Sequence, residues 1–422
     1  MGAPTTPTSN ANTSDYRFPL TALLLLAAAI FVAVTSEFVP VGLLSDLAAE
    51  FDVSKSQVGL LVTIFAGSVV LSAAPLTALT RKVPRKQLVI VVLIVFAIGN
   101  MLAALAPTFA VLIIARVIGG VAHGLFWSIV GAYTGYLVPK RHLGRAVAIT
   151  SGGGSAAFVL GVPLGTALGH EVGWRMTFGV IAGIIVVIIL LVLKFLPAIS
   201  HGVELKTGEI ALPMRKDKTM LGVVLLCIIV LITMNAHYIF YTYIEPYLTE
   251  VAGFNPDNIA SLLFLFGGAG AIGLVISGFV ADKYPKAGLA VAFGVVAVAV
   301  VVIALWPTNT PLVLGAIVVW AIAFGGAPAM MQTRLLHTAS PRIRDAASAW
   351  YTSAFNAAIG LGALIGGGLL DRFSLEILPF VDVALLLVGI VVLLVSNTTL
   401  RRRATPDNVT LTTGSISTIG SP

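Results

Sequence analysis

The sequence predicts an all-helical membrane protein that crosses the bilayer twelve times. Of its 422 residues, 58% are hydrophobic and only 10% are charged, which is too few charges to cover a soluble protein of this length. The apolar residues gather into runs of about 20, the length that a helix needs to cross a hydrocarbon core of about 30 Å. Charged loops separate the runs and alternate in sign along the chain.

Proline, glycine and charged clusters mark where each apolar run ends. The first run follows a polar segment and is too long for the apolar part of a signal peptide, so we expect it to be retained as a span. The twelve predicted spans cover residues 19–44, 56–80, 87–106, 109–137, 143–169, 175–196, 219–247, 257–281, 287–305, 311–335, 343–370 and 376–396.

The loop charges predict the orientation. The loops after odd-numbered spans carry acids, among them Asp46, Glu50, Asp52, Glu250 and Asp257. With the even loops and both tails on one side, only Lys55, Arg175 and Arg372 of the 25 Lys and Arg residues fall on the other side, and Arg116 lies within a span. By the positive-inside rule both termini are cytoplasmic. The net charge of +7 therefore reflects topology, and we expect no nucleic-acid partner.

One long polar connection, "SHGVELKTGEIALPMRKDK" at 200–218, divides the chain into two halves of six spans. We expect five regions: a cytoplasmic tail at 1–18, an N-terminal six-helix bundle at 19–196, a cytoplasmic linker at 197–218, a C-terminal six-helix bundle at 219–396 and a disordered cytoplasmic tail at 397–422.

The halves resemble each other at an offset near 200 residues. "TSEFVP" at 35–40 matches "TYIEP" at 242–246, and "RKVPRK" at 81–86 matches "DKYPK" at 282–286. Chance similarity among apolar helices is the alternative. Parallel six-helix repeats, related by an axis along the membrane normal, are a transporter architecture with substrate bound between the halves.

Four segments have more specific patterns: "LTALTRKVPRK" at 76–86, "ARVIGGVAHG" at 115–124, "GGGSAAFVLGVPLGTALG" at 152–169 and "GFVADKYPK" at 278–286. With them the chain resembles the major facilitator superfamily over residues 17–396. Within that family it is similar to the twelve-span drug:proton antiporter branch, near bacterial sugar, purine-nucleoside and chloramphenicol efflux permeases. The resemblance implies a pseudo-symmetric fold of two six-helix bundles and a monomer.

The resemblance also implies gating residues. The loop after span two departs from the family motif, because Leu76 and Thr80 replace its glycine and its acid. In span five, glycine spacing lets helices approach closely and a proline bends the span. The residues expected to gate are Arg81, Arg85, Lys86, Gly161, Pro163, Gly165, Gly278, Asp282 and Lys283.

Charged groups inside spans are costly and call for a partner or a function. Glu37 lies seven residues before Leu44, roughly 10 Å below the outer end of its span, and Arg116 lies about 12 Å below the outer end of span four. We expect the two to be in contact, with Glu37 exchanging a proton and Arg116 tuning it. A fixed structural pair and a permanently protonated carboxyl are the alternatives.

His123 follows Arg116 by two helical turns on the same face, where it either relays protons or is bound by a neighbouring helix. Glu245, which matches Glu37 in the repeat, is expected to be solvated from outside, and Asp382 is expected at the membrane interface.

Aromatic and amide residues in spans four, seven, ten and eleven suggest an apolar pocket with a few polar handles. Interfacial belts of Tyr and Trp are the alternative. The residues predicted to bind substrate are Phe126, Trp127, Asn235, His237, Tyr238, Tyr241, Trp320, Phe324, Tyr351, Phe355 and Asn356.

The chain has no phosphate-binding lysine loop, no metal-ligand spacing and no nucleophile elbow. Its single cysteine, Cys227, excludes an intramolecular disulfide. We therefore expect no enzyme, metal or cofactor. The predicted function is proton-coupled export of a small amphipathic molecule across the bacterial plasma (inner) membrane, with the proton gradient as energy source and protons, substrate and membrane lipid as partners. A sugar or nucleoside uptake symporter and a non-transporting sensor are the alternatives.

Overall fold

The computed structural model describes residues 18–80, 83–139, 142–198, 217, 219–284, 287–340 and 343–404. Within these ranges the elements are helices and no strand occurs. Twelve helical segments of the described chain are long and apolar enough to cross a membrane. The predicted fold class, an all-helical protein with twelve spans, is confirmed.

The first half supplies six spans: α1 (Leu20–Gly42), α3 (Lys55–Leu79), α4 (Arg85–Ala104), α5 (Phe109–Leu137), the composite α6 (Leu143–Ala156), η2 (Ala157–Gly161) and α7 (Val162–Val172), and α8 (Trp174–Phe195). The second half supplies α9 (Met220–Tyr241), α11 (Ile259–Lys283), α12 (Gly288–Leu305), the broken span α13 (Thr310–Gly325) and α14 (Ala327–Thr338), α15 (Arg344–Arg372) and α16 (Leu378–Ala404).

Short helices lie in the loops: α2 (Leu44–Phe51), α10 (Ile244–Pro246), η4 (Tyr247–Val251), η5 (Pro256–Asn258) and η6 (Leu375–Ile377). Pro246 explains why span seven ends before the predicted residue 247. Pro246 has no N–H to bond the carbonyl of Thr242, four residues earlier. Helix α9 ends at Tyr241, one residue before Thr242.

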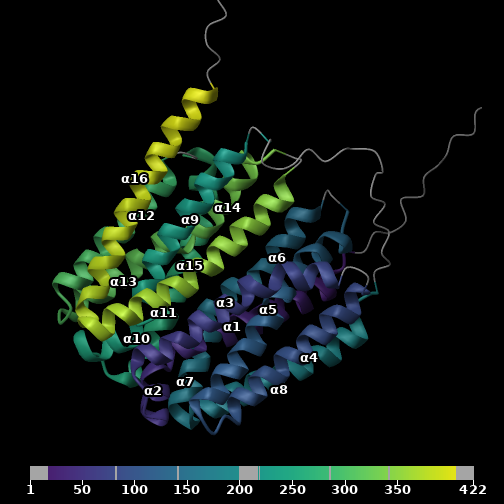
Figure 1. The fold of residues 1–422 in the computed structure, drawn as a ribbon, viewed down its shortest axis with the longest axis horizontal. Coiled ribbons are helices and arrows are strands. Elements are labelled where there is room, and N and C mark those ends of the chain that lie inside the picture. The colour runs from purple at the N-terminus through teal and green to yellow at the C-terminus, as the bar shows by residue number, and fades with distance from the viewer. Residues whose placement is uncertain are drawn as a thin grey trace, which may run out of the picture.

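Each half forms its own bundle, and the two bundles meet along a seam. In Figure 1 the purple-to-blue helices of the first half lie at the lower right and the teal-to-yellow helices of the second half lie at the upper left. Across the seam α3 packs against α15, and α11 packs against η2 and α7. This is the two-bundle architecture expected for rocking of one half against the other.

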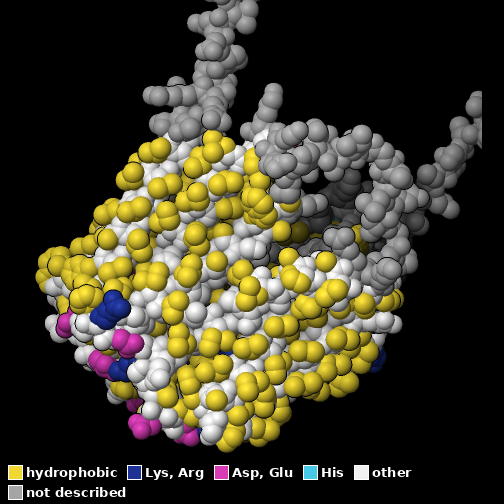
Figure 2. Space-filling model, in the orientation of Figure 1, with side chains coloured by type: hydrophobic (Ala, Val, Ile, Leu, Met, Phe, Trp, Pro, Cys, Tyr) yellow, Lys and Arg dark blue, Asp and Glu magenta, His cyan; other side chains and the backbone are white. Residues whose placement is uncertain are grey.

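The two ends of the molecule differ in charge. We call the end where α1 and α9 terminate the odd-loop face and the opposite end the even-loop face. In Figure 2 acidic and basic side chains gather on the odd-loop face, at the lower left, and hydrophobic side chains cover most of the visible flank of both bundles. An apolar flank between polar ends matches a bilayer setting.

The seam is closed at the odd-loop face and open towards the even-loop face. On α3, Leu61 and Phe65 are buried, whereas Leu71 and Leu79, nearer the even-loop face, are each 78% exposed. On α15, Ile359 is buried and Trp350 is 43% exposed.

Candidate functional site

The centre of the first bundle is built around a proline. Pro40 lies inside α1 and has no N–H, so the Ser36 carbonyl four residues earlier has no helical donor. The Arg116 guanidinium of α5 fills this role: Nη1 donates to Ser36 O at 2.8 Å and Nη2 donates to Glu37 O at 2.9 Å. The sequence "SEFVP" thus prepares a binding site for the buried arginine.

The predicted contact between Glu37 and Arg116 exists, but it is made through the backbone. Arg116 binds the Glu37 carbonyl instead of the carboxyl. Its guanidinium also lies over the Phe65 ring, 4.2 Å from the centroid. A guanidinium is a fixed fork of donors that suits two adjacent carbonyls, and both Arg116 and Glu37 are almost completely buried.

The Glu37 carboxyl faces histidine. Its Oε2 lies 3.3 Å from His123 Nε2. The same nitrogen accepts a hydrogen bond of 2.6 Å from the indole Nε1 of Trp127, one turn further along α5. The rings of Phe65 and Phe96 enclose the imidazole, with centroids 5.2 and 6.2 Å away.

Asn100 of α4 completes the support of this site and was not predicted. Ser36 Oγ donates to Asn100 Oδ1 at 2.7 Å, and Asn100 Nδ2 donates to Phe96 O at 2.8 Å. An asparagine in an apolar span was the signal that could have identified it, because a buried amide needs partners. We call Glu37, Arg116, His123 and Trp127 the proton site, after the role that we propose for them below.

A second cluster occupies the other half. The aromatic cluster consists of His237, Tyr238, Tyr241, Phe266, Trp320 and Phe324. His237 lies between Phe324, whose ring is 3.6 Å away at 14°, and Tyr241, 5.0 Å away at 18°. Five of the six residues were predicted. Phe266, whose ring centroid is 5.1 Å from that of Trp320, was missed because a lone Phe in an apolar span is unremarkable.

The two sites meet across the seam. Phe38, next to Glu37, stacks on Tyr238 of the aromatic cluster with centroids 5.9 Å apart, and it packs on Phe158 of η2 at 4.9 Å. Tyr238 in turn contacts the edge of Phe355. The aromatic cluster is thus in direct contact with Phe38, the residue beside the acid.

The remaining predicted substrate residues are placed differently. Tyr351 donates through its hydroxyl to Pro328 O, and Asn356 Nδ2 donates to Thr352 O of its own helix. Asn235 is buried where α9 meets α15, with its backbone oxygen against Gly362. Phe126 is buried in the hydrophobic core of the protein and is not part of the aromatic cluster.

The predicted gating residues do not form one group. Arg81 lies outside the described residues, as do the side-chain surroundings of Asp282. Lys86 Nζ donates to Leu193 O at 2.9 Å within the first half. Arg85 is half-buried, Gly278 is exposed, and Lys283 lies over the Tyr284 ring.

The glycines of span five pack on α1. A side chain at Gly161 would collide with Thr35 Oγ1, and one at Gly165 would lie 2.6 Å from Val39 Cγ2. Pro163 is buried directly after the π-helical turn η2. These residues join α7 to the helix that carries the acid.

Three polar contacts, which we call the odd-face latch, join the halves. Ser45 of α2 donates from its backbone N–H (3.0 Å) and its hydroxyl (2.8 Å) to Glu245 Oε2, Ser56 Oγ donates to Asp371 Oδ1 at 2.5 Å, and Lys55 pairs with Glu250. No local pattern indicated these partners, because the donors and their acids lie about 200 residues or more apart.

Two expectations about carboxyls were wrong. Glu245, expected to be solvated, is 4% exposed in α10, beyond the end of span seven. Burial raises the pKa of Glu245 from 4.5 to about 7, although its bonds to Ser45 act in the opposite direction. Asp382, expected at the interface, is fully buried, and neither of its carboxyl oxygens has a partner in the described part of the chain.

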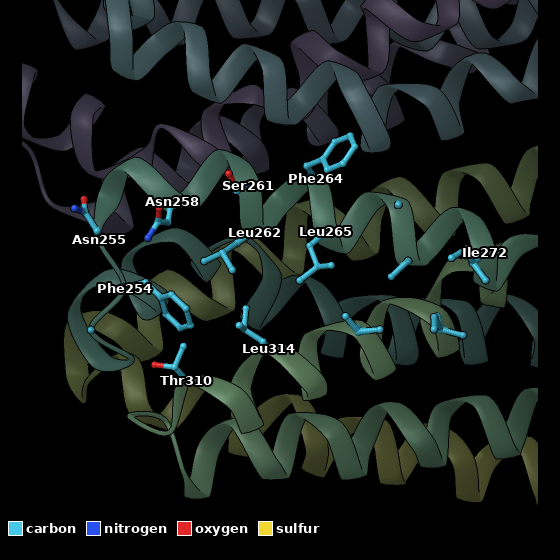
Figure 3. A pocket seen from close by; sticks show the side chains of 15 residues that line it. Phe254, Asn255, Asn258, Ser261, Leu262, Phe264, Leu265, Ile272, Thr310 and Leu314 are labelled. Carbon is cyan, nitrogen blue, oxygen red and sulfur yellow. The ribbon is translucent and has the colours of Figure 1, made fainter.

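A groove of about 890 Å³ lies elsewhere, between α11 and α13. Figure 3 shows the amide and hydroxyl groups of Asn255, Asn258 and Thr310 at one end and leucine side chains along the middle. No residue of the proton site or the aromatic cluster lines it. Among the residues that the structure describes, no three His, Cys, Asp or Glu side chains lie together as metal ligands.

Comparison with known proteins identifies the fold. The family model described as Major Facilitator Superfamily matches residues 26–339 and 226–417. Three solved structures superpose at low sequence identity. A bacterial homologue of the human lysosomal transporter Spinster, in an inward-facing and occupied conformation, has a TM-score of 0.72 and 18% identity, covering 92% of this chain and 98% of that one.

A mutant of the nucleoside transporter NupG has a TM-score of 0.72 and 15% identity, covering 89% of this chain and 99% of that one. The human organic anion transporter MFSD10 has a TM-score of 0.67 and 16% identity, with the same coverage. At these identities the likeness shows the fold.

Proposed function

Because this chain belongs to the major facilitator superfamily, whose solved relatives are transporters of small molecules, we propose that it is a proton-coupled exporter in a bacterial inner membrane. The observation that carries the proposal is the enclosure of Glu37. A carboxyl that is 5% exposed lies 3.3 Å from a histidine nitrogen, beside a buried guanidinium. Such groups inside a span mark ion or proton pathways.

Two opposing effects act on the protonation of the Glu37 carboxyl. Burial favours the neutral acid, whereas the positive charge of Arg116, held on the adjacent carbonyls, favours the carboxylate. The balance depends on whether water reaches the site from the open face. One proton moving down 100 mV of membrane potential supplies about 2.3 kcal/mol, and a pH gradient adds to it.

The substrate enters from the even-loop face, which the positive-inside rule assigns to the cytoplasm. The exposed seam residues of α3 and α15 lie at that end, and the odd-face latch closes the opposite end. Substrate arriving at the aromatic cluster displaces Tyr238 or Phe38, opens the acid to water and releases its proton inwards. After the halves rock, a proton from outside restores the acid and the substrate leaves.

The aromatic cluster defines the class of substrate. Stacked rings accept flat, apolar molecules, and His237 Nδ1, buried without a partner among the described residues, offers one polar handle. A molecule with a planar ring system and one or two polar groups fits this chemistry. Because a nucleoside transporter is among the solved relatives, purine nucleosides come first in a test panel, followed by chloramphenicol-like drugs and arabinose-like sugars.

Transport into inverted membrane vesicles tests the proposal. An exporter accumulates substrate in these vesicles when their lumen is made acidic, and a protonophore abolishes the accumulation. The Glu37→Gln variant, folded but unable to exchange the proton, shows no such accumulation. Symport would reverse the direction of the driven flux, a sensor would bind substrate without moving it, and full pH-driven transport by Glu37→Gln would refute the coupling role.

A further inference from the structure

We propose that Trp127 is a positioning residue of the proton site and does not contact substrate. Its indole N–H holds His123 in the tautomer that can only accept a proton from Glu37. This inference rests on the proposed function, because it assigns a role within the same proton exchange. It also reassigns a residue that the sequence placed in the substrate pocket.

The inference rests on which nitrogen of the imidazole ring has the proton and which has the lone pair. The indole nitrogen is a donor only, and Trp127 Nε1 lies 2.6 Å from His123 Nε2. This nitrogen therefore presents its lone pair, and the proton of the neutral ring is on Nδ1. A second N–H on Nε2 would point at the indole N–H.

The consequence concerns the acid. Glu37 Oε2 lies 3.3 Å from the same Nε2. An ionised carboxylate there would face a lone pair with no proton between them, whereas a carboxylic acid can donate its O–H. The observed arrangement thus fits the proton-loaded form, in which the indole N–H and the acid O–H both approach the single lone pair of Nε2.

The surroundings leave the proton no other position. A charged imidazole would carry an N–H on Nε2, which already receives the indole N–H. His123 Nδ1 has no acceptor among the described residues in either protonation state. Arg116, already cationic, lies on the same helix. The titratable groups that face Glu37 are Arg116 and His123 from α5 and Tyr238 from α9. The side chains that α3 and α4 place at the site, Phe65, Phe96 and Asn100, do not titrate.

Removing the indole N–H changes which protonation state of Glu37 is favoured. Without it, the His123 proton can move to Nε2 and be donated to an ionised Glu37. A hydrogen bond to a charged acceptor is about twice as strong as a neutral one, so the carboxylate gains more than the acid does. The change moves proton release to lower pH.

The experiment compares Trp127→Phe with Trp127→Gln. Phenylalanine keeps a ring without a donor, and glutamine keeps an N–H within reach of His123 one turn away. For Trp127→Phe we expect the midpoint of the pH profile of transport to fall by roughly half a unit to one unit. The carboxylic C=O band of Glu37, assigned in infrared difference spectra by its loss in Glu37→Gln, should disappear at correspondingly lower pH. Trp127→Gln should restore both midpoints.

Trp306→Phe is the matched control, because Trp306 is 51% exposed at the end of α12. An unchanged profile and band in Trp127→Phe, with transport still lost in Glu37→Gln, would overturn this inference and leave the proposed function standing. Full transport by Glu37→Gln would instead remove the proposed function. If Trp127→Phe does not fold, nitrogen NMR of ¹⁵N-histidine in the unaltered protein decides: the Nδ1–H tautomer supports the inference, and the Nε2–H tautomer contradicts it.

Discussion

Two buried glutamates, Glu37 and Glu245, follow the same local pattern and serve different parts of the molecule. Glu37 lies three residues before Pro40 and Glu245 lies directly before Pro246, and each glutamate is at most 5% exposed. The partners of Glu37 all belong to the first bundle, whereas Glu245 is bound by Ser45 of the opposite bundle. When rigid halves rock, the contacts of Glu37 with Arg116 and His123 persist, whereas the contact of Glu245 with Ser45 separates. Glu37 can therefore hold a proton while the halves move, whereas the protonation of Glu245 depends on whether the odd-loop face is closed.

Replacing each acid by glutamine is the strongest test of this division. Glu37→Gln should lower pH-driven transport at least 100-fold, because the amide cannot release a proton. A 100-fold loss corresponds to about 3 kcal/mol. Glu245→Gln should retain coupling, because the carbonyl of the introduced amide still accepts from Ser45. Flux measured in proteoliposomes with an imposed pH gradient separates the two. Equal losses in both variants would make the two acids equivalent and break the comparison.

Arg116 sharpens the first half of the comparison. In Arg116→Leu, the carbonyls of Ser36 and Glu37 lose their donors in a buried setting, which costs roughly 2–5 kcal/mol of folding stability. Arg116→Lys keeps the charge and one hydrogen-bond donor group, so its folding stability should lie between that of the leucine variant and that of the natural protein. Thermal unfolding in detergent, with transport measured on the surviving fraction, checks the order. A lysine variant as unstable as leucine would mean that charge contributes little.

The pH dependence of the latch tests Glu245. Its pKa is about 7 with the odd-loop face closed, against an ordinary 4.5 once solvated. Because the closed form binds the proton more tightly, low pH stabilises closure: the effect is complete below about pH 4.5 and is lost as pH rises through 7. Between pH 5 and pH 8 the ratio of closed to open protein should fall on the order of tenfold or more.

Spin-label distances across the odd-loop face measure that ratio. Labels at Ala49→Cys and Glu376→Cys, in a background with Cys227→Ser, report on the two halves at exposed positions. Glu245→Gln should abolish most of the pH response, and any remainder would come from Asp46, a neighbouring acid whose charge acts on Glu245. A response that persists unchanged in Glu245→Gln would remove Glu245 as its source.

The spans and the central acid could be predicted because both follow from the bilayer. Hydrocarbon thickness fixes the length of an apolar run, so eleven of the predicted spans agree with the apolar spanning segments to within a few residues, and span seven, which Pro246 ends early, differs more. The last helix, α16, continues to Ala404, beyond the predicted end of its span at residue 396. Glu37 was found because a carboxyl in such a run is costly. Neither prediction needs to know how one helix is turned against the next.

The partners could not be predicted because they depend on that rotation. Arg116 was expected on the Glu37 carboxyl, yet it binds the carbonyls of Ser36 and Glu37. The amide of Asn100 is itself a signal in an apolar span, but its partner Ser36 depends on how α1 and α4 face each other. Glu245 was placed in water because its burial arises from the closed seam between halves, which no local pattern records.

Pro40→Ala tests the smallest effect and the origin of the proton site. Alanine supplies an N–H to the Ser36 carbonyl, so α1 gains a hydrogen bond and Arg116 Nη1 meets a competing donor. We expect higher thermal stability together with a few-fold slower transport, because the guanidinium that flanks Glu37 is held less firmly. Pro246→Ala is the matched variant: it extends α9 towards Glu245 and should change the pH response of the latch instead of coupling. Slower transport without a gain in stability would show that Pro40 acts by bending α1 and not by freeing the carbonyl.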